Sequence, residues 1–218
     1  MGREDWYRNR VWDAETEAAF RDRLKRSRSL FSKVQYIRIQ AAYLLASDDP
    51  SVRKAGLDLM YEFLNDYPDT EDTLSDKTLA FTQLGDFFFE RRDWDRAFVH
   101  YKKALDLPLS LNHCRHGTII GYVKSAVKTS RAGEYDNCAL LLGKVEPVFL
   151  ADNFEVGLAG AMLNDARGDH DAARECASVA LRTLGMTSPF RRGEKILGNA
   201  SAVATEEDIR FLESILSA

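Results

Sequence analysis

Residues 79–107 decide the fold, and they read LAFTQLGDFFFERRDWDRAFVHYKKALDL. Apolar residues recur three and four positions apart on both sides of Arg92-Asp93, which is the spacing of one face of an α-helix. Polar residues between two such patterns indicate a turn. The stretch therefore predicts two helices, at 78–91 and 94–107, which a short connection holds antiparallel.

The same helical periodicity extends over most of the chain. The alternating pattern that is typical of strands is absent, so the sequence predicts an all-α fold. Further helices are expected at 13–28, 34–46, 51–66, 117–131, 135–150, 153–167 and 170–184, with a last helix from Thr205. The expected connections include an acidic loop at 69–77, a loop at 108–116 and an irregular stretch at 185–204.

Seven residues of the deciding stretch follow the order of a known helical repeat. They are Phe81, Leu84, Gly85, Phe88, Ala97, Tyr101 and Ala104. In this order they resemble the tetratricopeptide repeat (TPR), a helix–turn–helix unit of about 34 residues. Small residues in such a unit let two helices approach, and large residues fill the space between pairs. The resemblance implies a right-handed α–α superhelix.

Weaker copies of the unit lie on both sides of this stretch. Their small residues Ala55, Ala97, Cys138 and Ala173 are 42, 41 and 35 residues apart. We interpret the longer spacings as loop insertions at 68–77 and 108–116. The resemblance thus predicts a TPR-like solenoid of about four helix pairs at 36–184. An N-terminal capping helix is expected at 1–35, and an irregular segment with a C-terminal capping helix at 185–218.

The resemblance implies a binding scaffold and not an enzyme. TPR proteins generally bind a partner protein or peptide in a concave groove, which the first helix of each pair lines. The groove positions of this chain map to Gln40, Thr82, Gln83, Asp86, Phe89, Lys124 and Arg131. Phe89 has a second interpretation, packing against adjacent pairs, because three consecutive aromatic residues cannot all face one core.

A charge pattern sharpens this prediction. No Asp or Glu occurs between positions 107 and 133, whereas Lys124, Lys128 and Arg131 are spaced to share one helix face. A cationic stripe of this kind predicts an acidic peptide as the ligand, with Arg131 gripping a carboxylate. The alternative is a solvated helix face whose cations lie near the helix C-terminus, where the helix dipole favours them.

Alternatives to a partner-binding scaffold remain open at this level. One is a regulatory sensor that binds a small peptide or ligand, and another is a structural homodimer formed through apolar end caps. Within the scaffold interpretation, the small size of the chain favours a dedicated chaperone, antitoxin or immunity-type partner.

Composition and motifs argue against several classes of function. The formal net charge of −4 argues against a nucleic-acid partner, and no apolar run is long enough to predict a membrane span. Three scattered cysteines without a CxxC motif indicate a reducing, cytoplasmic compartment. No motif of a catalytic or phosphate-binding site occurs, so no catalytic residue and no cofactor are predicted. The set His113, Cys114 and His116 lacks a second ligand pair, so no metal is expected.

Overall fold

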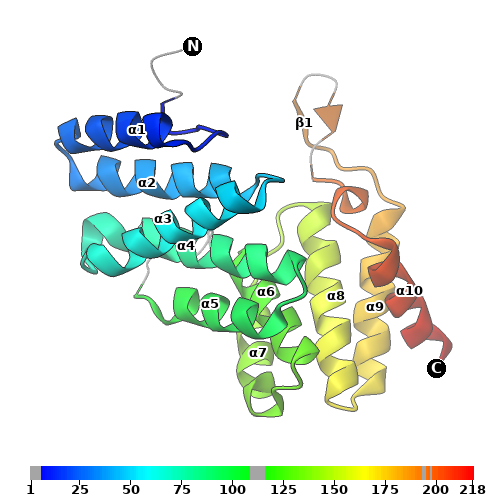
Figure 1. The fold of residues 1–218 in the computed structure, drawn as a ribbon. Helices are drawn as coiled ribbons and strands as arrows, with labels where there is room; N and C mark the ends of the chain where they lie inside the picture. Colours follow the sequence, from blue (N-terminus) through cyan, green and yellow to red (C-terminus); the bar gives the residue numbers. More distant parts are fainter. Residues whose placement is uncertain (1–5, 109–115, 193–194, 197) are drawn as a thin grey trace.

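Helices make up most of the computed structural model, which describes residues 6–108, 116–192, 195–196 and 198–218 (Figure 1). In chain order they are α1 (Ala14–Arg26), α2 (Leu30–Leu45), α3 (Pro50–Asp66), α4 (Glu71–Glu90), α5 (Trp94–Asp106), α6 (His116–Lys128), α7 (Tyr135–Leu142), α8 (Leu150–Ala166), α9 (His170–Leu184) and α10 (Glu206–Ser217). Two short 3-10 helices, η2 (Ala132–Glu134) and η3 (Ala200–Ala202), join them. The prediction of a helical fold is confirmed.

Only one small element of the described chain is extended. Strands β1 (Arg191–Arg192) and β2 (Lys195–Ile196) pair antiparallel inside the stretch that was predicted to be irregular. Among the described residues, none of the helices combines the length and the apolar character that a membrane span requires.

The helices pack in consecutive pairs. The pairs are α2 with α3, α4 with α5, α6 with α7, and α8 with α9, and α5 also packs on α6, more extensively than α7 does. The first helices of the pairs also contact one another in chain order, α2 with α4, α4 with α6, and α6 with α8. In Figure 1 helices α1 to α5 run across the view and α8 to α10 run up it, so the helix axes change direction along the chain.

Three of these pairs share one turn geometry. Each turn contains a residue with positive φ, and the following residue donates its backbone N–H to the carbonyl five positions earlier, which is the Schellman arrangement. The positive-φ residues are Arg92, Ser130 and Gly168, and the bonds are Asp93 to Phe88, Arg131 to Ala126, and Asp169 to Asn164. Both steps between the positive-φ residues are 38 residues long. The backbone therefore repeats at a constant interval over 92–168.

This interval explains the unequal spacings of the small residues. Ala97 and Ala173 each lie five residues after the positive-φ residue of their turn, whereas Cys138 lies eight residues after Ser130. The three residues of η2, which precede α7, account for the difference. The difference between the spacings of 41 and 35 residues thus reflects the extra turn of 3-10 helix before α7.

The predicted acidic loop at 69–77 is wrong, because α4 already begins at Glu71. A capping box between Thr70 and Thr73 starts the helix. Asp76 and Lys77 are buried inside it, where Asp76 accepts a hydrogen bond from Arg38 of α2 (2.5 Å) and Lys77 forms an ion pair with Asp69. Paired charges can be buried, which an acidic composition alone does not reveal.

Two other predicted helices end elsewhere. The helix predicted at 117–131 ends at Lys128, because Ser130 has a φ of 53°. The helix predicted at 135–150 ends at Leu142, and α8 begins at Leu150 instead of 153. Pro147 lies in the connection between them, and a proline in a helix interior removes a backbone hydrogen bond.

The core changes character along the chain. Around α4, α5 and α6 it is aromatic, and Tyr101 of α5 fills the space in front of Gly85 of α4 and Gly121 of α6. A Cβ atom at either glycine would come within 2.5 Å of the Tyr101 ring. Between α8 and α9 the buried residues of α9 are mostly alanines, whereas α8 contributes larger side chains such as Phe154 and Leu158, and its Gly157 lies against the backbone of α9.

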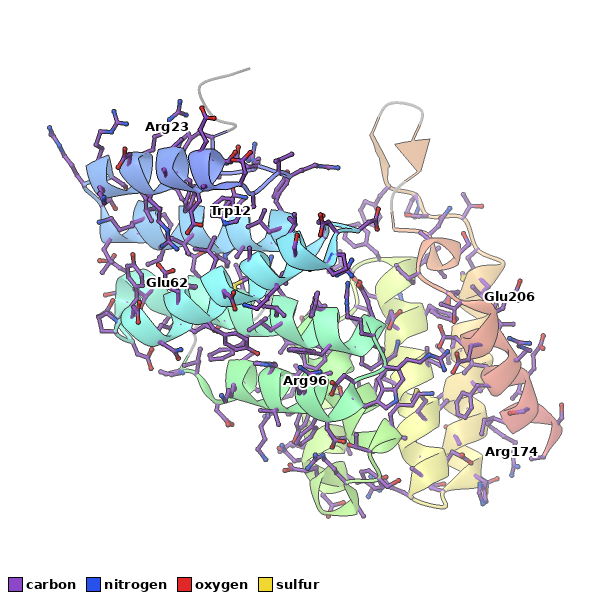
Figure 2. All side chains as sticks on the ribbon, viewed as in Figure 1. Trp12, Arg23, Glu62, Arg96, Arg174 and Glu206 are labelled. Carbon is purple, nitrogen blue, oxygen red and sulfur yellow. The ribbon has the colours of Figure 1, made fainter. Side chains whose placement is uncertain are left out.

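Both ends of the described chain are covered. Trp6 packs against Phe20 of α1 and Tyr36 of α2. At the other end, Leu212 and Ile215 of α10 are buried in the core that α8 and α9 share. Side chains fill the interior between these ends, as Figure 2 shows.

Candidate functional site

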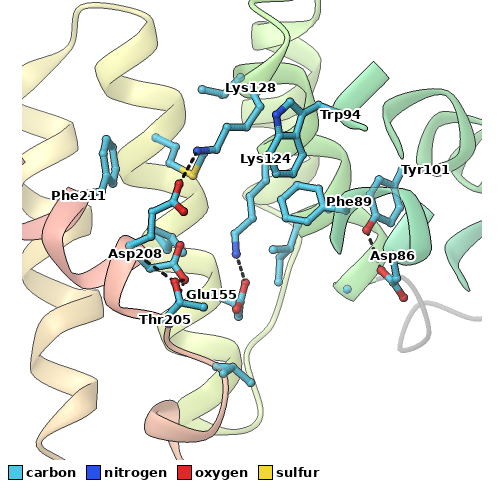
Figure 3. A pocket seen from close by; sticks show the side chains of 18 of the residues that line it. Asp86, Phe89, Trp94, Tyr101, Lys124, Lys128, Glu155, Thr205, Asp208 and Phe211 are labelled. Carbon is cyan, nitrogen blue, oxygen red and sulfur yellow. Dashed lines mark hydrogen bonds and ion pairs between the residues drawn. The ribbon is translucent and has the colours of Figure 1, made fainter. Parts of the chain in front are cut away.

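A pocket of about 1010 Å³ lies between the first helices of the last three pairs and the C-terminal helix. Helices α4, α6 and α8 line it, together with the start of α5 and residues 203–211 at α10 (Figure 3). The pocket thus lies on the side of the molecule that the first helices of the pairs share.

The largest part of the lining is a set of apolar side chains that we call the apolar wall. It consists of Phe89, Trp94, Ile120, Val127, Leu158, Met162 and Phe211. The rings of Phe89 and Trp94 meet edge to face with their centroids 4.8 Å apart. Phe89 thus packs against Trp94 of the same helix pair and also lines the pocket.

Asp86 and Tyr101 form a polar pair beside this wall. The Tyr101 hydroxyl donates a hydrogen bond to Asp86 Oδ1 at 2.7 Å. Desolvation by the surrounding protein raises the pKa of the Asp86 carboxyl, and the hydrogen bond from Tyr101 partly offsets that rise. Burial is also the main cause that raises the pKa of the Tyr101 hydroxyl, followed by the charge of Asp86. Tyr101 therefore stays a hydrogen-bond donor.

The two predicted lysines line the pocket, but both are paired within the chain. Lys124 forms an ion pair with Glu155 of α8, and the side chains are only 11% and 23% exposed. Lys128 Nζ lies 3.6 Å from Glu207 of α10, whose carboxylate also accepts a hydrogen bond from Arg92 at 2.7 Å. The structure thus provides no free cationic stripe in the described part of the pocket.

Carboxylates outnumber these lysines in the lining. Seven acidic residues line the pocket: Asp86, Glu90, Asp152, Glu155, Asp165, Glu207 and Asp208. Three of them, Asp86, Asp152 and Asp208, have no Lys, Arg or His partner among the described residues, and we call these the unpaired carboxylates. Asp165 Oδ1 lies 3.4 Å from His170 Nδ1. The unpaired carboxylates come from α4, α8 and α10, so acidic groups surround the apolar wall from three helices.

The other four predicted binding residues lie outside the pocket lining. Gln40 is fully buried and exchanges hydrogen bonds with Asn9, which fixes the N-terminal segment. Thr82 bonds to Thr118 at 2.8 Å and joins α4 to α6.

The remaining two predicted residues, Gln83 and Arg131, also lie outside the pocket lining. The Oε1 atom of Gln83 is buried without a hydrogen-bond partner among the described residues. Arg131 donates to Asp95 at 2.6 Å and lies 4.3 Å above the ring of Phe98. The prediction that Arg131 grips a ligand carboxylate in the groove with Lys124 and Lys128 has no support in this geometry.

Sequence reasoning missed the far side of the pocket. Leu158, Met162 and Glu155 lie on α8, which the repeat pattern assigns to the first helix of a pair, so the same mapping could have found them. Glu207 and Phe211 lie on α10, which was predicted only to cap the solenoid. No local signal in the sequence places that helix against the pocket.

The described residues contain no group of three or more His, Cys, Asp or Glu side chains arranged to hold a metal ion. Of the set His113, Cys114 and His116, for which no metal is expected, His113 and Cys114 lie outside the described residues. Comparison of the chain with protein-family models, with curated proteins and with solved structures found no match.

Proposed function

We propose that this protein is a TPR-like scaffold that binds a segment of a partner protein in the pocket between α4, α6, α8 and α10. The observation that carries the proposal is the position of the pocket: it lies on the first helices of consecutive pairs. That is the surface on which the resemblance to TPR proteins predicts a ligand.

The backbone supports the superhelical part of the proposal. Turns of one geometry recur at intervals of 38 residues, and the first helices contact one another in order. A constant relation between neighbouring units is what builds a superhelix from helix pairs.

The chemistry of the lining supports a protein segment as the ligand. Small-molecule sites usually have volumes of about 300–1,000 Å³ with a few convergent polar groups. This pocket is at the upper end of that range, and aromatic and aliphatic side chains from α4, α5, α6, α8 and α10 line it. Aromatic residues such as Phe89 and Trp94 contribute much of the binding free energy at protein interfaces when a partner covers them.

Gly117 of α6 offers a way to block the pocket without disturbing the core. It lines the pocket, and a Cβ atom built on it meets no described atom within 4 Å. The variant Gly117→Trp therefore fills the pocket with a large side chain. Gly133 provides the matched control, because a Cβ atom there also meets nothing within 4 Å and Gly133 lies outside the pocket lining.

The test captures proteins from a lysate of the source organism on three immobilised forms, the wild type, Gly117→Trp and Gly133→Trp. Circular dichroism first verifies that all three have the same helix content. We expect at least one protein that the wild type and Gly133→Trp retain and that Gly117→Trp retains at least about tenfold less, a difference of about 1.4 kcal/mol. Equal capture by all three forms would contradict binding in the pocket.

A further inference from the structure

We infer that the segment bound in the pocket is amphipathic and basic, with apolar side chains on the apolar wall and lysine or arginine side chains facing the unpaired carboxylates. The inference rests on the proposed function and names the chemistry of the partner. It reverses the acidic ligand that the charge pattern of the sequence predicts.

The first step is the charge of the lining. Two lysines and seven carboxylates line the described part of the pocket, and the ion pairs Lys124–Glu155 and Lys128–Glu207 use both lysines. A net negative, partly desolvated surface attracts a cationic ligand and repels an anionic one. An acidic segment would have to displace Glu155 or Glu207 from its lysine.

The second step is the state of the unpaired carboxylates. Asp86 accepts a hydrogen bond from Tyr101, which holds its side chain in place. Asp152 accepts hydrogen bonds from the backbone N–H groups of Val148 and Phe149, and Asp208 accepts two from Thr205, one from its backbone N–H and one from its hydroxyl. Asp152 and Asp208 lie in the first turns of α8 and α10, where the helix dipole offsets part of their charge, and no cationic side chain among the described residues neutralises the rest. A partner ammonium or guanidinium group supplies the missing charge.

The third step is that the protein already places a cation on the apolar wall. Lys128 Nζ lies 5.8 Å from the centroid of the Trp94 ring. An ammonium group at about 6 Å from an indole face is attracted by the ring electrons. A basic partner side chain can make the same interaction, since Lys128 is 38% exposed and its contact with Glu207 is 3.6 Å long.

The geometry fits a ligand with basic residues on both sides of an apolar stripe. Figure 3 shows Asp86 near Phe89 on one side of the pocket and Asp208 near Phe211 on the other. An amphipathic helix presents such a pattern, with apolar residues three and four positions apart and basic residues flanking them.

Three synthetic peptides of equal length test the inference. All three carry leucines at the same helical positions, and the remaining positions are lysine in the first, glutamate in the second and glutamine in the third. Their binding to the full chain is measured by fluorescence anisotropy at low and at moderate salt. We expect the leucine–lysine peptide to bind the wild type most tightly and to lose affinity as salt rises. We also expect it to bind the Gly117→Trp variant much more weakly, because the tryptophan side chain occupies the pocket.

Paired variants separate local from overall charge. In Asp86→Asn/Asp165→Asn two carboxylates of the pocket lining become neutral, whereas Glu175→Gln/Glu213→Gln removes the same charge from exposed positions outside the pocket lining. We expect the first double variant to bind the leucine–lysine peptide about three- to tenfold more weakly than the wild type. The second should bind it less than about twofold more weakly. The Lys128→Gln variant should bind this peptide about twofold more tightly, because it removes a cation from the pocket and frees the face of Trp94, while Glu207 keeps its bond from Arg92.

The outcomes distinguish the inference from the proposed function. Tighter binding of the leucine–glutamate or leucine–glutamine peptide, blocked by Gly117→Trp, would overturn the basic ligand and leave the pocket as a binding site. Equal losses in the two double variants would also overturn it, because the attraction would then come from overall charge. Binding of none of the three peptides would overturn it as well, and the capture experiment would still decide the proposed function.

Discussion

The α4–α5 and α8–α9 pairs have nearly the same turn and opposite kinds of packing. In both, an aspartate caps the second helix, Asp93 with φ −89° and ψ 70° and Asp169 with φ −89° and ψ 77°. Yet the ring of Tyr101 fills the contact of α5 with Gly85 of α4, whereas small residues of α9, Ala180 and Cys176, meet Gly157 of α8. The comparison teaches that one turn geometry accommodates side chains of different volume between its two helices.

The two pairs are therefore expected to fail in opposite ways. We call α4–α5 the aromatic pair and α8–α9 the alanine pair. A smaller side chain should lower the free energy of unfolding most in the aromatic pair, and a larger side chain should lower it most in the alanine pair. The following variants test this contrast in order of the expected effect.

Tyr101→Ala is expected to have the largest effect. It empties the space in front of two glycines and removes the hydroxyl that bonds Asp86, so the free energy of unfolding should fall by about 4 kcal/mol. Urea denaturation measures the change. The counterpart in the alanine pair, Ala177→Gly, should cost only about 1 kcal/mol, the usual helix-propensity difference. Similar losses for both variants would break the comparison.

Acidification should act on the aromatic pair through His100. This residue is 5% exposed and lies between Phe88 and Phe81, and its Nε2 atom is 2.9 Å from the Tyr61 hydroxyl. Burial, with smaller effects from Lys103 and Arg96, lowers the pKa of His100 to about 4 from 6.5.

The lowered pKa of His100 makes acid destabilise the folded chain. Because the unfolded chain binds the proton more readily, the contribution of His100 is fully present above about pH 6.5 and is lost as the pH falls toward 4, by roughly 3 kcal/mol at most. Urea denaturation at several pH values, compared with His100→Phe, isolates this contribution. A wild type and variant with parallel pH profiles would show that His100 is protonated equally in both states.

Gly157→Ala should have the smallest effect, and its sign is the informative part. The new Cβ atom would lie 3.0 Å from Ala180 Cβ and 3.1 Å from backbone atoms of α9, so the helices must separate. We expect a net loss of about 1 kcal/mol, although alanine favours a helix over glycine by a similar amount. Gly117→Ala, which meets no described atom, should instead gain up to about 1 kcal/mol. Thermal denaturation of the two variants measures both signs.

Periodicity predicted the helices well where a helix has one apolar face and polar ends. The helix expected at 170–184 is α9, and the one expected at 94–107 differs from α5 by one residue. It failed at the start of α4, because Asp76 and Lys77 are buried through partners at Arg38 and Asp69. A pattern of hydrophobicity cannot show that two charges neutralise each other across helices.

A similar limit applies to the candidate site, because four of the eight predicted binding residues line the pocket. The repeat positions indicated Asp86, Phe89 and Lys124, and the charge spacing indicated Lys128. The sign of its charge was not predictable, because the partners of the lysines, Glu155 and Glu207, lie 31 and 79 positions further along the chain. Only the folded arrangement brings these groups together.

The contact of Tyr101 with Gly85 and Gly121 has a consequence for how this chain can evolve. The three residues lie on three helices, and the Tyr101 ring occupies the space that a side chain at position 85 or 121 would need. A larger residue at either glycine is therefore tolerated only with a smaller residue at position 101. In diverging descendants of this sequence these positions should change together or not at all. Covariation among 85, 101 and 121 is thus an inherited signature of the way α5 is held between α4 and α6.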